Sequence, residues 1–174
     1  DEGVSGEKRF GISSFYVPKK VAETGNLKSQ EAVMKYIERS KIPVFLDLGI
    51  TSGRIHPGAA YSFSWDKVDP DLDGKNFDFS GTDASITLAE KYDIQILPSF
   101  SPHSDWMART VYLETDKQDA YQKYILDIVE RYDKDGKDDM PGLKNPIIYW
   151  QLDNEADLKN AISKRKGKTF ETPD

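Results

Sequence analysis

The chain has no cysteine, which excludes disulfide bonds and metal sites built from thiolates. No apolar stretch approaches the roughly 20 residues that a membrane-spanning helix needs. Basic residues are also outnumbered, since 24 Lys and Arg stand against 30 Asp and Glu and give a net charge of −6. That balance argues against nucleic acid or an anionic membrane surface as the main partner.

The remaining composition fits a globular domain. The chain has 174 residues, of which 37% are hydrophobic and 31% charged, enough for one domain with a substantial core. Residue 1 is Asp rather than Met, so we expect a processed or trimmed chain. Removal of a secretory signal would explain this start, and we therefore expect a secreted or extracellular protein.

Strand and helix patterns alternate along the chain. We expect strands at residues 10–17, 50–56, 94–100 and 147–155, helices at residues 29–41, 82–92 and 116–132, a helical turn at residues 44–49, and a long loop at residues 66–81. Ser29 is a candidate N-cap, and the helix at residues 116–132 has the clearest apolar stripe.

This alternation predicts a parallel sheet with right-handed crossovers, either an open doubly wound sheet or a closed barrel. No Gly-x-Gly-x-x-Gly segment follows the first strand, which weakens the dinucleotide-binding form of the open sheet. The loops after the later strands carry Trp, His, Asp and Glu, which favours a barrel with a site at its C-terminal rim. A full barrel takes roughly 250 residues. We therefore predict an α/β fold, the N-terminal half of a (β/α)₈ TIM barrel with about four βα units and the last helix missing.

The fourth predicted strand ends in the most informative residues of the chain. Residues 147–152 are mostly apolar and predict a strand buried in the sheet, while Asp153, Asn154 and Glu155 crowd its C-terminal end. Carboxylates are costly to bury unless they are paired or functional. Catalytic groups also collect at this end of the strands in barrels, so Asn154 and Glu155 are the leading site candidates.

Three stretches together resemble the clan A glycoside hydrolases, which are retaining glycosidases on a (β/α)₈ barrel. Residues 48–55 (Leu-Gly-Ile-Thr-Ser-Gly-Arg-Ile) resemble the clan's second strand, which ends in an arginine. Residues 63–70 (Phe-Ser-Trp-Asp-Lys-Val-Asp-Pro), continued by Asn-Phe-Asp-Phe and Asp83, are similar to the passage that precedes its third strand. Residues 149–155 (Tyr-Trp-Gln-Leu-Asp-Asn-Glu) resemble its fourth-strand Asn-Glu motif.

The resemblance implies hydrolysis of β-linked sugars by two carboxyl groups about 5 to 5.5 Å apart. Glu155 would be the acid/base, and Asn154 would hydrogen-bond the sugar 2-hydroxyl. The clan's nucleophile is a glutamate at the end of strand seven, which these 174 residues do not reach. We therefore expect the chain alone to be inactive, and no organic cofactor is implied.

The resemblance also implies supporting residues, each of which has a structural alternative. Arg54 matches the arginine that orients the nucleophile, although an ion pair with Asp47 or Asp83 would equally explain it. His103 lies in the loop where the clan often has a sugar-binding group, and could be a plain loop histidine. Trp106 lies in the same polar loop and is expected to stack on a sugar face, although it could instead anchor the loop or pack in the core.

For the other two tryptophans, Trp65 and Trp150, we expect a packing role over sugar stacking. The acidic segment at residues 133–139 has an Asp-x-Asp-Gly pattern but lacks the Glu at the twelfth position of a calcium loop. We expect a solvated turn there and no metal site.

Two other interpretations remain open. The first is a non-catalytic carbohydrate-binding protein. The second is a half-barrel that pairs with the missing C-terminal half or with a second copy of itself. A bare four-strand half would expose two parallel edges and an apolar inner face, so either partner would cover a surface that is otherwise costly.

Overall fold

The computed structural model describes residues 10–13, 15–17, 19–25, 27–103 and 115–152. The elements in chain order are β1 (Phe10–Ile12), α1 (Lys19–Thr24), α2 (Gln30–Ser40), α3 (Ile42–Asp47), β2 (Ile50–Ile55), α4 (Trp65–Val68), α5 (Ser80–Lys91), β3 (Gln95–Phe100), the 3-10 helix η2 (Thr115–Lys117), α6 (Gln118–Glu130) and β4 (Gln151–Leu152). None of the helices among these residues is long and apolar enough to cross a membrane.

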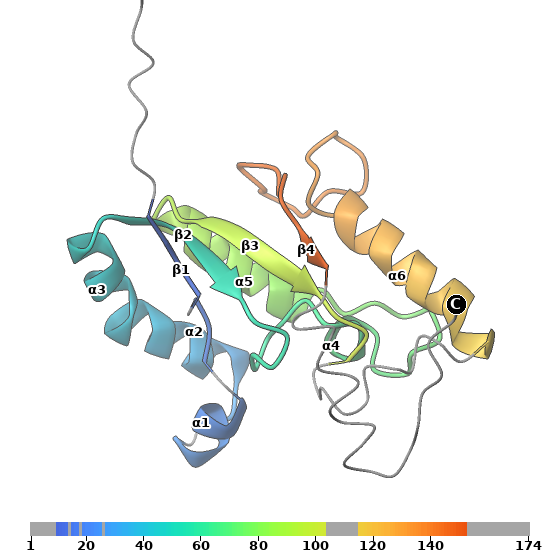
Figure 1. Cartoon of the computed structure of the whole chain (residues 1–174), viewed down its shortest axis with the longest axis horizontal. Helices are drawn as coiled ribbons and strands as arrows, with labels where there is room; N and C mark the ends of the chain where they lie inside the picture. Colours follow the sequence, from blue (N-terminus) through green and yellow to red (C-terminus); the bar gives the residue numbers. More distant parts are fainter. Residues whose placement is uncertain (1–9, 14, 18, 26, 104–114, 153–174) are drawn as a thin grey trace, which may run out of the picture.

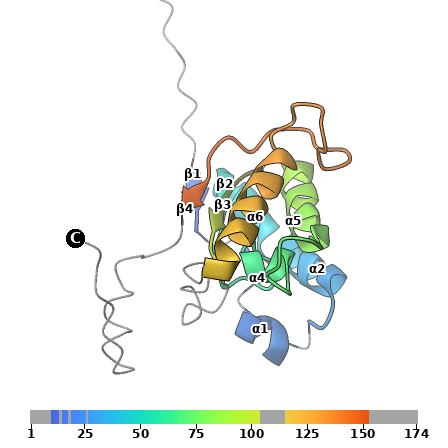
Figure 2. The same ribbon diagram turned by 90° about the vertical axis from the view of Figure 1, so that its right-hand side faces the viewer.

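The four strands form one sheet in the order β1-β2-β3-β4, and every neighbouring pair is parallel. The sheet is curled like half of a barrel, and helices α2, α5 and α6 lie on the same side of it (Figures 1 and 2). The predicted alternation of strands and helices around a parallel sheet is confirmed. The fold is a mixed α/β half-barrel.

Local signals fix the helices as the sequence predicts. The backbone N–H of Ala32 donates to the Ser29 hydroxyl at 3.1 Å, which caps α2. Gly49 follows α3 with a φ of 66°, a left-handed conformation that costs glycine little. In α6, Tyr124 and Ile128 are fully buried, so the apolar stripe of this helix faces the core.

The core lies between the sheet and the helices. Its largest fully buried side chains are Trp65, Tyr124, Tyr132, Phe15 and Phe63. Aromatic rings therefore supply much of the buried apolar surface, which is the main source of stability in a domain of this size.

Two element boundaries differ from the sequence prediction. The first predicted strand ends at Ile12, and Phe15 and Val17 beyond it are buried in the core. The predicted loop at residues 66–81 contains most of α4 and the start of α5. The first error arises because Phe15 and Val17 are buried from an irregular segment, which periodicity does not detect. The second arises because α4 is a single short turn of helix, too short to show a period.

The prediction for the fourth strand is wrong over most of its described part. Only Gln151–Leu152 pairs with β3, and Ile148, Tyr149 and Leu152 are 60%, 66% and 81% exposed. The cause lies before the strand, where Glu90 and the carbonyl of Tyr132 hold backbone amides of residues 144–147. These bonds keep the segment away from the first half of β3.

Candidate active site at the C-terminal ends of the strands

The sheet has one face under the helices and one face turned away from them. Ile55, Ile96 and Phe100 belong to the core under the helices, and side chains alternate between faces along a strand. The strand register therefore gathers polar side chains on the opposite face, namely Ser13, Ser52, Arg54, Gln95, Ser99 and Gln151. This face is mixed rather than purely apolar, since Ile50 and Leu97 lie on it among the polar side chains.

Arg54 lies on this polar face near the end of β2. Its Nη1 donates to the Ser13 hydroxyl at 3.2 Å, which links β2 to the end of β1. Of the two ion pairs considered for it, the pair with Asp83 is wrong, since Arg131 binds that carboxylate. Asp47 lies at the opposite end of β2, before the strand begins.

Ser99 is the most deeply buried polar side chain of the same face. It is 1% exposed, and its hydroxyl has no hydrogen-bond partner among the described residues. It pairs in register with Gln151 of β4. Burial of a hydroxyl without a hydrogen bond costs free energy. Ser99 is therefore an unusual residue for the packed interior of a barrel.

The sequence patterns gave no role to His56, which directly follows β2. Its ring stacks on the Tyr16 ring with centroids 5.8 Å apart. Its Nδ1 accepts a hydrogen bond from the Gly58 N–H at 3.0 Å, so the neutral ring carries its proton on Nε2. A histidine at the C-terminal end of a predicted parallel strand is the signal that could have identified it.

His103 lies in the loop after β3, where the sequence predicts it. Its Nδ1 is 3.9 Å from Oδ2 of Asp66, beyond hydrogen-bonding distance but close enough for a favourable charge interaction when the ring is protonated. The same carboxylate oxygen is 3.1 Å from Nζ of Lys67. The Ser101 hydroxyl donates to the His103 carbonyl at 3.0 Å and steadies the loop.

Beside this cluster, Lys67 also lines a cavity of about 450 Å³ between α1, α2 and the loop after β2. Tyr61 forms part of its wall, and burial raises the pKa of that phenol. The phenol therefore stays neutral at ordinary pH and can donate or accept a hydrogen bond. The volume lies in the range of small-molecule sites.

Trp65 and Trp150 have packing roles, as expected: Trp65 is buried in the core and Trp150 is half-buried against it. Trp65 is 0% exposed, and its Nε1 donates to Oδ2 of Asp69 at 2.9 Å. The N–H of Gly74 donates to the same oxygen at 2.7 Å, so Asp69 fastens the loop after α4. Trp150 stacks face to face on Phe100 with centroids 4.6 Å apart. The Trp65 ring is therefore unavailable for sugar stacking, and one face of the Trp150 ring is covered by Phe100.

A buried polar network joins α5 to the end of α6. Arg131 binds both oxygens of Asp83, and the Tyr132 hydroxyl lies 2.6 Å from Oγ1 of Thr82 and 2.8 Å from Oδ1 of Asp83. Burial raises the pKa of Tyr132 and of Tyr124. Both phenols stay protonated at ordinary pH, so we assign them to the core rather than to acid–base chemistry.

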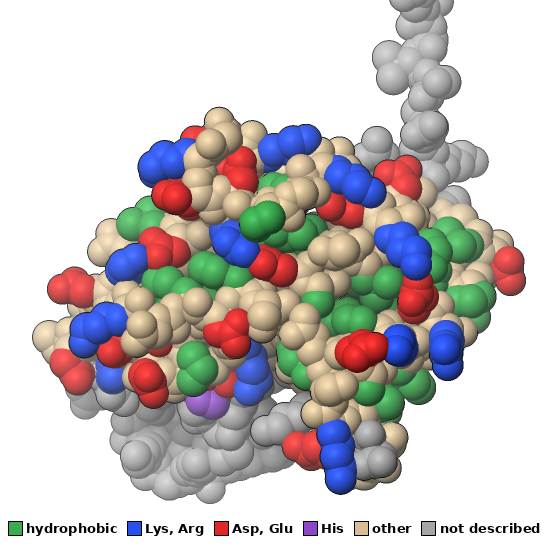
Figure 3. All heavy atoms as spheres, turned by 180° about the vertical axis from the view of Figure 1, so that it is seen from behind, with side chains coloured by type: hydrophobic (Ala, Val, Ile, Leu, Met, Phe, Trp, Pro, Cys, Tyr) green, Lys and Arg blue, Asp and Glu red, His purple; other side chains and the backbone are tan. Residues whose placement is uncertain are grey.

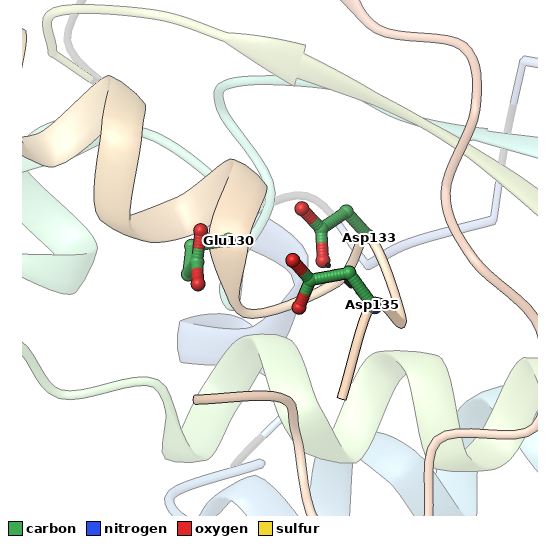
Figure 4. A group of neighbouring side chains, drawn as sticks. All are labelled: Glu130, Asp133 and Asp135. Carbon is green, nitrogen blue, oxygen red and sulfur yellow. Dashed lines mark hydrogen bonds between the residues drawn. The ribbon is translucent and has the colours of Figure 1, made fainter. Parts of the chain in front are cut away.

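Three carboxylates gather where α6 ends, those of Glu130, Asp133 and Asp135 (Figure 4). Their oxygens lie within 4.8 Å of one another. Nζ of Lys137 lies 2.9 Å from Oε1 of Glu130, and the N–H of Lys137 donates to Oδ1 of Asp135 at 2.9 Å. The segment is a turn that Lys137 partly neutralises, and the cluster by itself does not indicate a metal site.

The remaining predicted site residues, Asn154, Glu155 and Trp106, lie outside the described residues. Comparisons add no relative, since no protein-family model, curated protein or solved structure matches the chain. The resemblance to clan A rests on the sequence stretches around Arg54, Trp65 and Glu155.

Proposed function

We propose that the chain is the N-terminal half of a retaining glycoside hydrolase on a (β/α)₈ barrel, which in its complete form cleaves β-linked sugars. The observation that carries the proposal is the sheet itself, in which four parallel strands follow one another in chain order. Their C-terminal ends carry hydroxyl, guanidinium, imidazole and carboxylate groups, which suit a hydroxyl-rich substrate. The sequence resemblance supplies the identity of the reaction.

In this proposal Glu155 protonates the glycosidic oxygen and later activates water, while Asn154 bonds the sugar 2-hydroxyl. The contact from Asn154 strengthens in the transition state and so contributes to rate. Arg54 orients the nucleophile, His103 bonds a sugar hydroxyl, and Trp106 stacks on a sugar face. The chemistry needs no organic cofactor.

In this proposal the nucleophile lies outside residues 1–174, either in the C-terminal half of the barrel or in a second copy of the chain. Ile148 and Tyr149 before β4 and Leu152 within it are exposed, as expected for an edge that a partner covers. Sedimentation of the 174-residue chain separates the two partners. A uniform dimer supports the second copy, and a monomer that binds a separately made C-terminal half supports the first.

The role of Glu155 is tested in the protein that carries both halves. Glu155→Gln should lower kcat by at least about a hundredfold on glycosides with poor leaving groups. Aryl glycosides with activated leaving groups should lose far less in the bond-breaking step, because they do not need protonation. Asp116→Asn, an exposed change on η2, is the control. Equal losses on both substrates, or no loss, would contradict the acid role, and sugar binding without hydrolysis would favour a non-catalytic carbohydrate-binding protein.

A further inference from the structure

The cavity of about 450 Å³ lies between the segments that follow β1 and β2. One side is lined from α1 and the turn after it, and the other from the loop after β2 and from α4. Segments that follow parallel strands lie at the C-terminal end of the sheet, so the cavity and the candidate active site share that end.

Hydrogen bonds between backbone groups hold the walls of the cavity in place. The N–H of Leu27 donates to the carbonyl of Ala22 at 2.8 Å, which fixes the turn after α1. The N–H of Ala60 donates to the carbonyl of Val17 at 3.1 Å, which ties the loop after β2 to the chain before α1. The cavity is therefore formed before a ligand binds, as in most small-molecule sites.

The apolar part of the lining belongs to the core or packs against it. Ala22 and Val33 are 6% and 2% exposed and are part of the hydrophobic core. Leu27 and Ala60 are partly buried against the same core. The lining therefore contains a fixed apolar surface, on which the apolar face of a ring-shaped ligand can pack.

Tyr61 supplies an aromatic ring and a polar group to the cavity. The ring lies against α5, since a Cβ added at Gly81 would be 2.8 Å from Cδ1 of the ring. Burial raises the pKa of the phenol, and no residue in the described part of the chain forms a hydrogen bond with its hydroxyl. This hydroxyl is therefore able both to donate to a ligand and to accept from it.

Charged groups of both signs complete the lining. Glu23 and Lys28 are exposed, and neither forms an ion pair or a hydrogen bond with another residue that the structure describes. Nζ of Lys67 lies 3.1 Å from Oδ2 of Asp66, which balances its charge. Acidic and basic side chains are also interspersed over the helix-covered side of the molecule (Figure 3). The cavity thus offers donors and acceptors without a strong charge of one sign, which favours a neutral ligand.

The cavity adjoins the candidate active site through α4. Lys67 lines the cavity, while the neighbouring carboxylate of Asp66 lies 3.9 Å from Nδ1 of His103. His103 is in the loop after β3 and is a predicted sugar contact. A ligand in the cavity would therefore lie beside the region in which we place the substrate.

We propose that this cavity is a second sugar-binding site, which holds one neutral sugar unit in addition to the unit at the strand ends. The choice of ligand rests on the proposed function. A sugar ring has an apolar C–H face, which would pack on the Tyr61 ring. Its hydroxyls both donate and accept, and would bind the polar groups of Tyr61, Glu23 and Lys28. The volume lies toward the lower end of the range for small-molecule sites, as a single ring requires.

NMR titration of the ¹⁵N-labelled chain tests the site. The probes are the methyl β-glycosides of glucose, galactose, mannose, xylose and N-acetylglucosamine, each added alone. At least one should shift the amides of Ala22, Leu27 and Tyr61 with a dissociation constant of about 1 to 10 mM, since a single small ring makes few contacts. Sulfate, an anion without a C–H face, should leave these amides unshifted. No shift with any of the five glycosides, or equal shifts with sulfate, would overturn the proposal.

A matched pair of variants assigns the binding to the cavity. Tyr61→Phe keeps the ring and removes the hydroxyl, so it should weaken glycoside binding about threefold to tenfold. Tyr149→Phe removes the same group from a residue that is 66% exposed and does not line the cavity, and it should change nothing. Glu23→Gln removes a charged acceptor and should weaken binding about two- to fivefold. Unchanged binding in both cavity variants, or equal losses in Tyr61→Phe and Tyr149→Phe, would contradict the assignment.

The titration is also independent of hydrolysis. Shifts at the cavity, together with no hydrolysis by the protein that carries both halves, would support this site and contradict the proposed reaction. Hydrolysis by that protein, together with no shift at the cavity, would leave the reaction in place and overturn the second site.

Discussion

Arg131 binds both carboxylate oxygens of Asp83. Its Nε donates to Oδ1 at 2.9 Å, and its Nη2 donates to Oδ2 at 2.5 Å. The hydrogen bonds to Asp83 raise the pKa of the Arg131 guanidinium. The same guanidinium lies over the Phe79 ring, 4.7 Å from its centroid. This pair fastens the end of α6 to the first turn of α5, and therefore holds two helices of the layer that supports the sheet.

Asp83→Asn should destabilise the fold, because it leaves the partly buried Arg131 without its charged partner. We expect a loss of about 1 to 3 kcal/mol in the free energy of unfolding, measured by urea denaturation. Glu31→Gln breaks the exposed Glu31–Lys35 pair and should leave stability nearly unchanged. Equal effects of the two substitutions would show that the bidentate geometry is unimportant.

Gly53 should tolerate no side chain. A Cβ atom there would lie 2.6 Å from Cβ of Phe15, whose side chain is 1% exposed and cannot move outward without opening the core. Gly53→Ala should lower the free energy of unfolding by about 1 to 3 kcal/mol. At Gly58 an added Cβ would have its nearest contact at 3.4 Å, so Gly58→Ala is a control with a small expected effect. Thermal melting of both variants measures the difference.

The fold should lose stability in alkali. Burial raises the pKa of Tyr124 and Tyr132, so the folded chain keeps phenol protons that the unfolded chain releases near pH 10. Their contribution is therefore complete below about pH 10 and is lost as pH rises further, by up to about 1.4 kcal/mol per pH unit for each phenol.

Urea denaturation between pH 8 and pH 11.5 measures this loss (roughly the range on either side of the unfolded pKa). Tyr132→Phe should be less stable than the parent at neutral pH, because its hydrogen bonds to Thr82 and Asp83 are gone. Its stability should nevertheless fall less steeply in alkali. An unchanged slope in this variant would mean that Tyr132 titrates in the folded state.

The sequence predicts the elements well where a periodic pattern coincides with a local start or stop signal. Ser29 at the start of α2 and Gly49 after α3 are examples. It fails where a distant contact decides the outcome. Nothing local to residues 147–150 indicates that Glu90, far away on α5, holds the preceding backbone and leaves Ile148 and Tyr149 exposed.

In the candidate site, too, the sequence predicts what local signals determine and misses what distant contacts determine. The pattern places Arg54 at the end of the second strand and His103 in the loop after the third, which the fold confirms. The ion pair of Arg54 with Asp83 is wrong, because Arg131, which is distant in the sequence, binds that carboxylate. His56 could have been proposed from its position after β2. Its contact with Tyr16 could not, because the path of the chain beyond Ile12 depends on the burial of Phe15 and Val17.

Glu90 should be the residue that holds the segment before β4 in place. Glu90→Ala removes the acceptor for the N–H groups of Lys144 and Asn145, so both amides should exchange at least about tenfold faster with deuterium. Glu90→Gln keeps a carbonyl oxygen that can accept the same bonds, and should give an intermediate rate. Glu23→Ala, an exposed change on α1, should leave both amides unchanged. If exchange at Lys144 and Asn145 were equally slow in all three variants, the bond from Ile147 to the Tyr132 carbonyl would be sufficient to hold the segment.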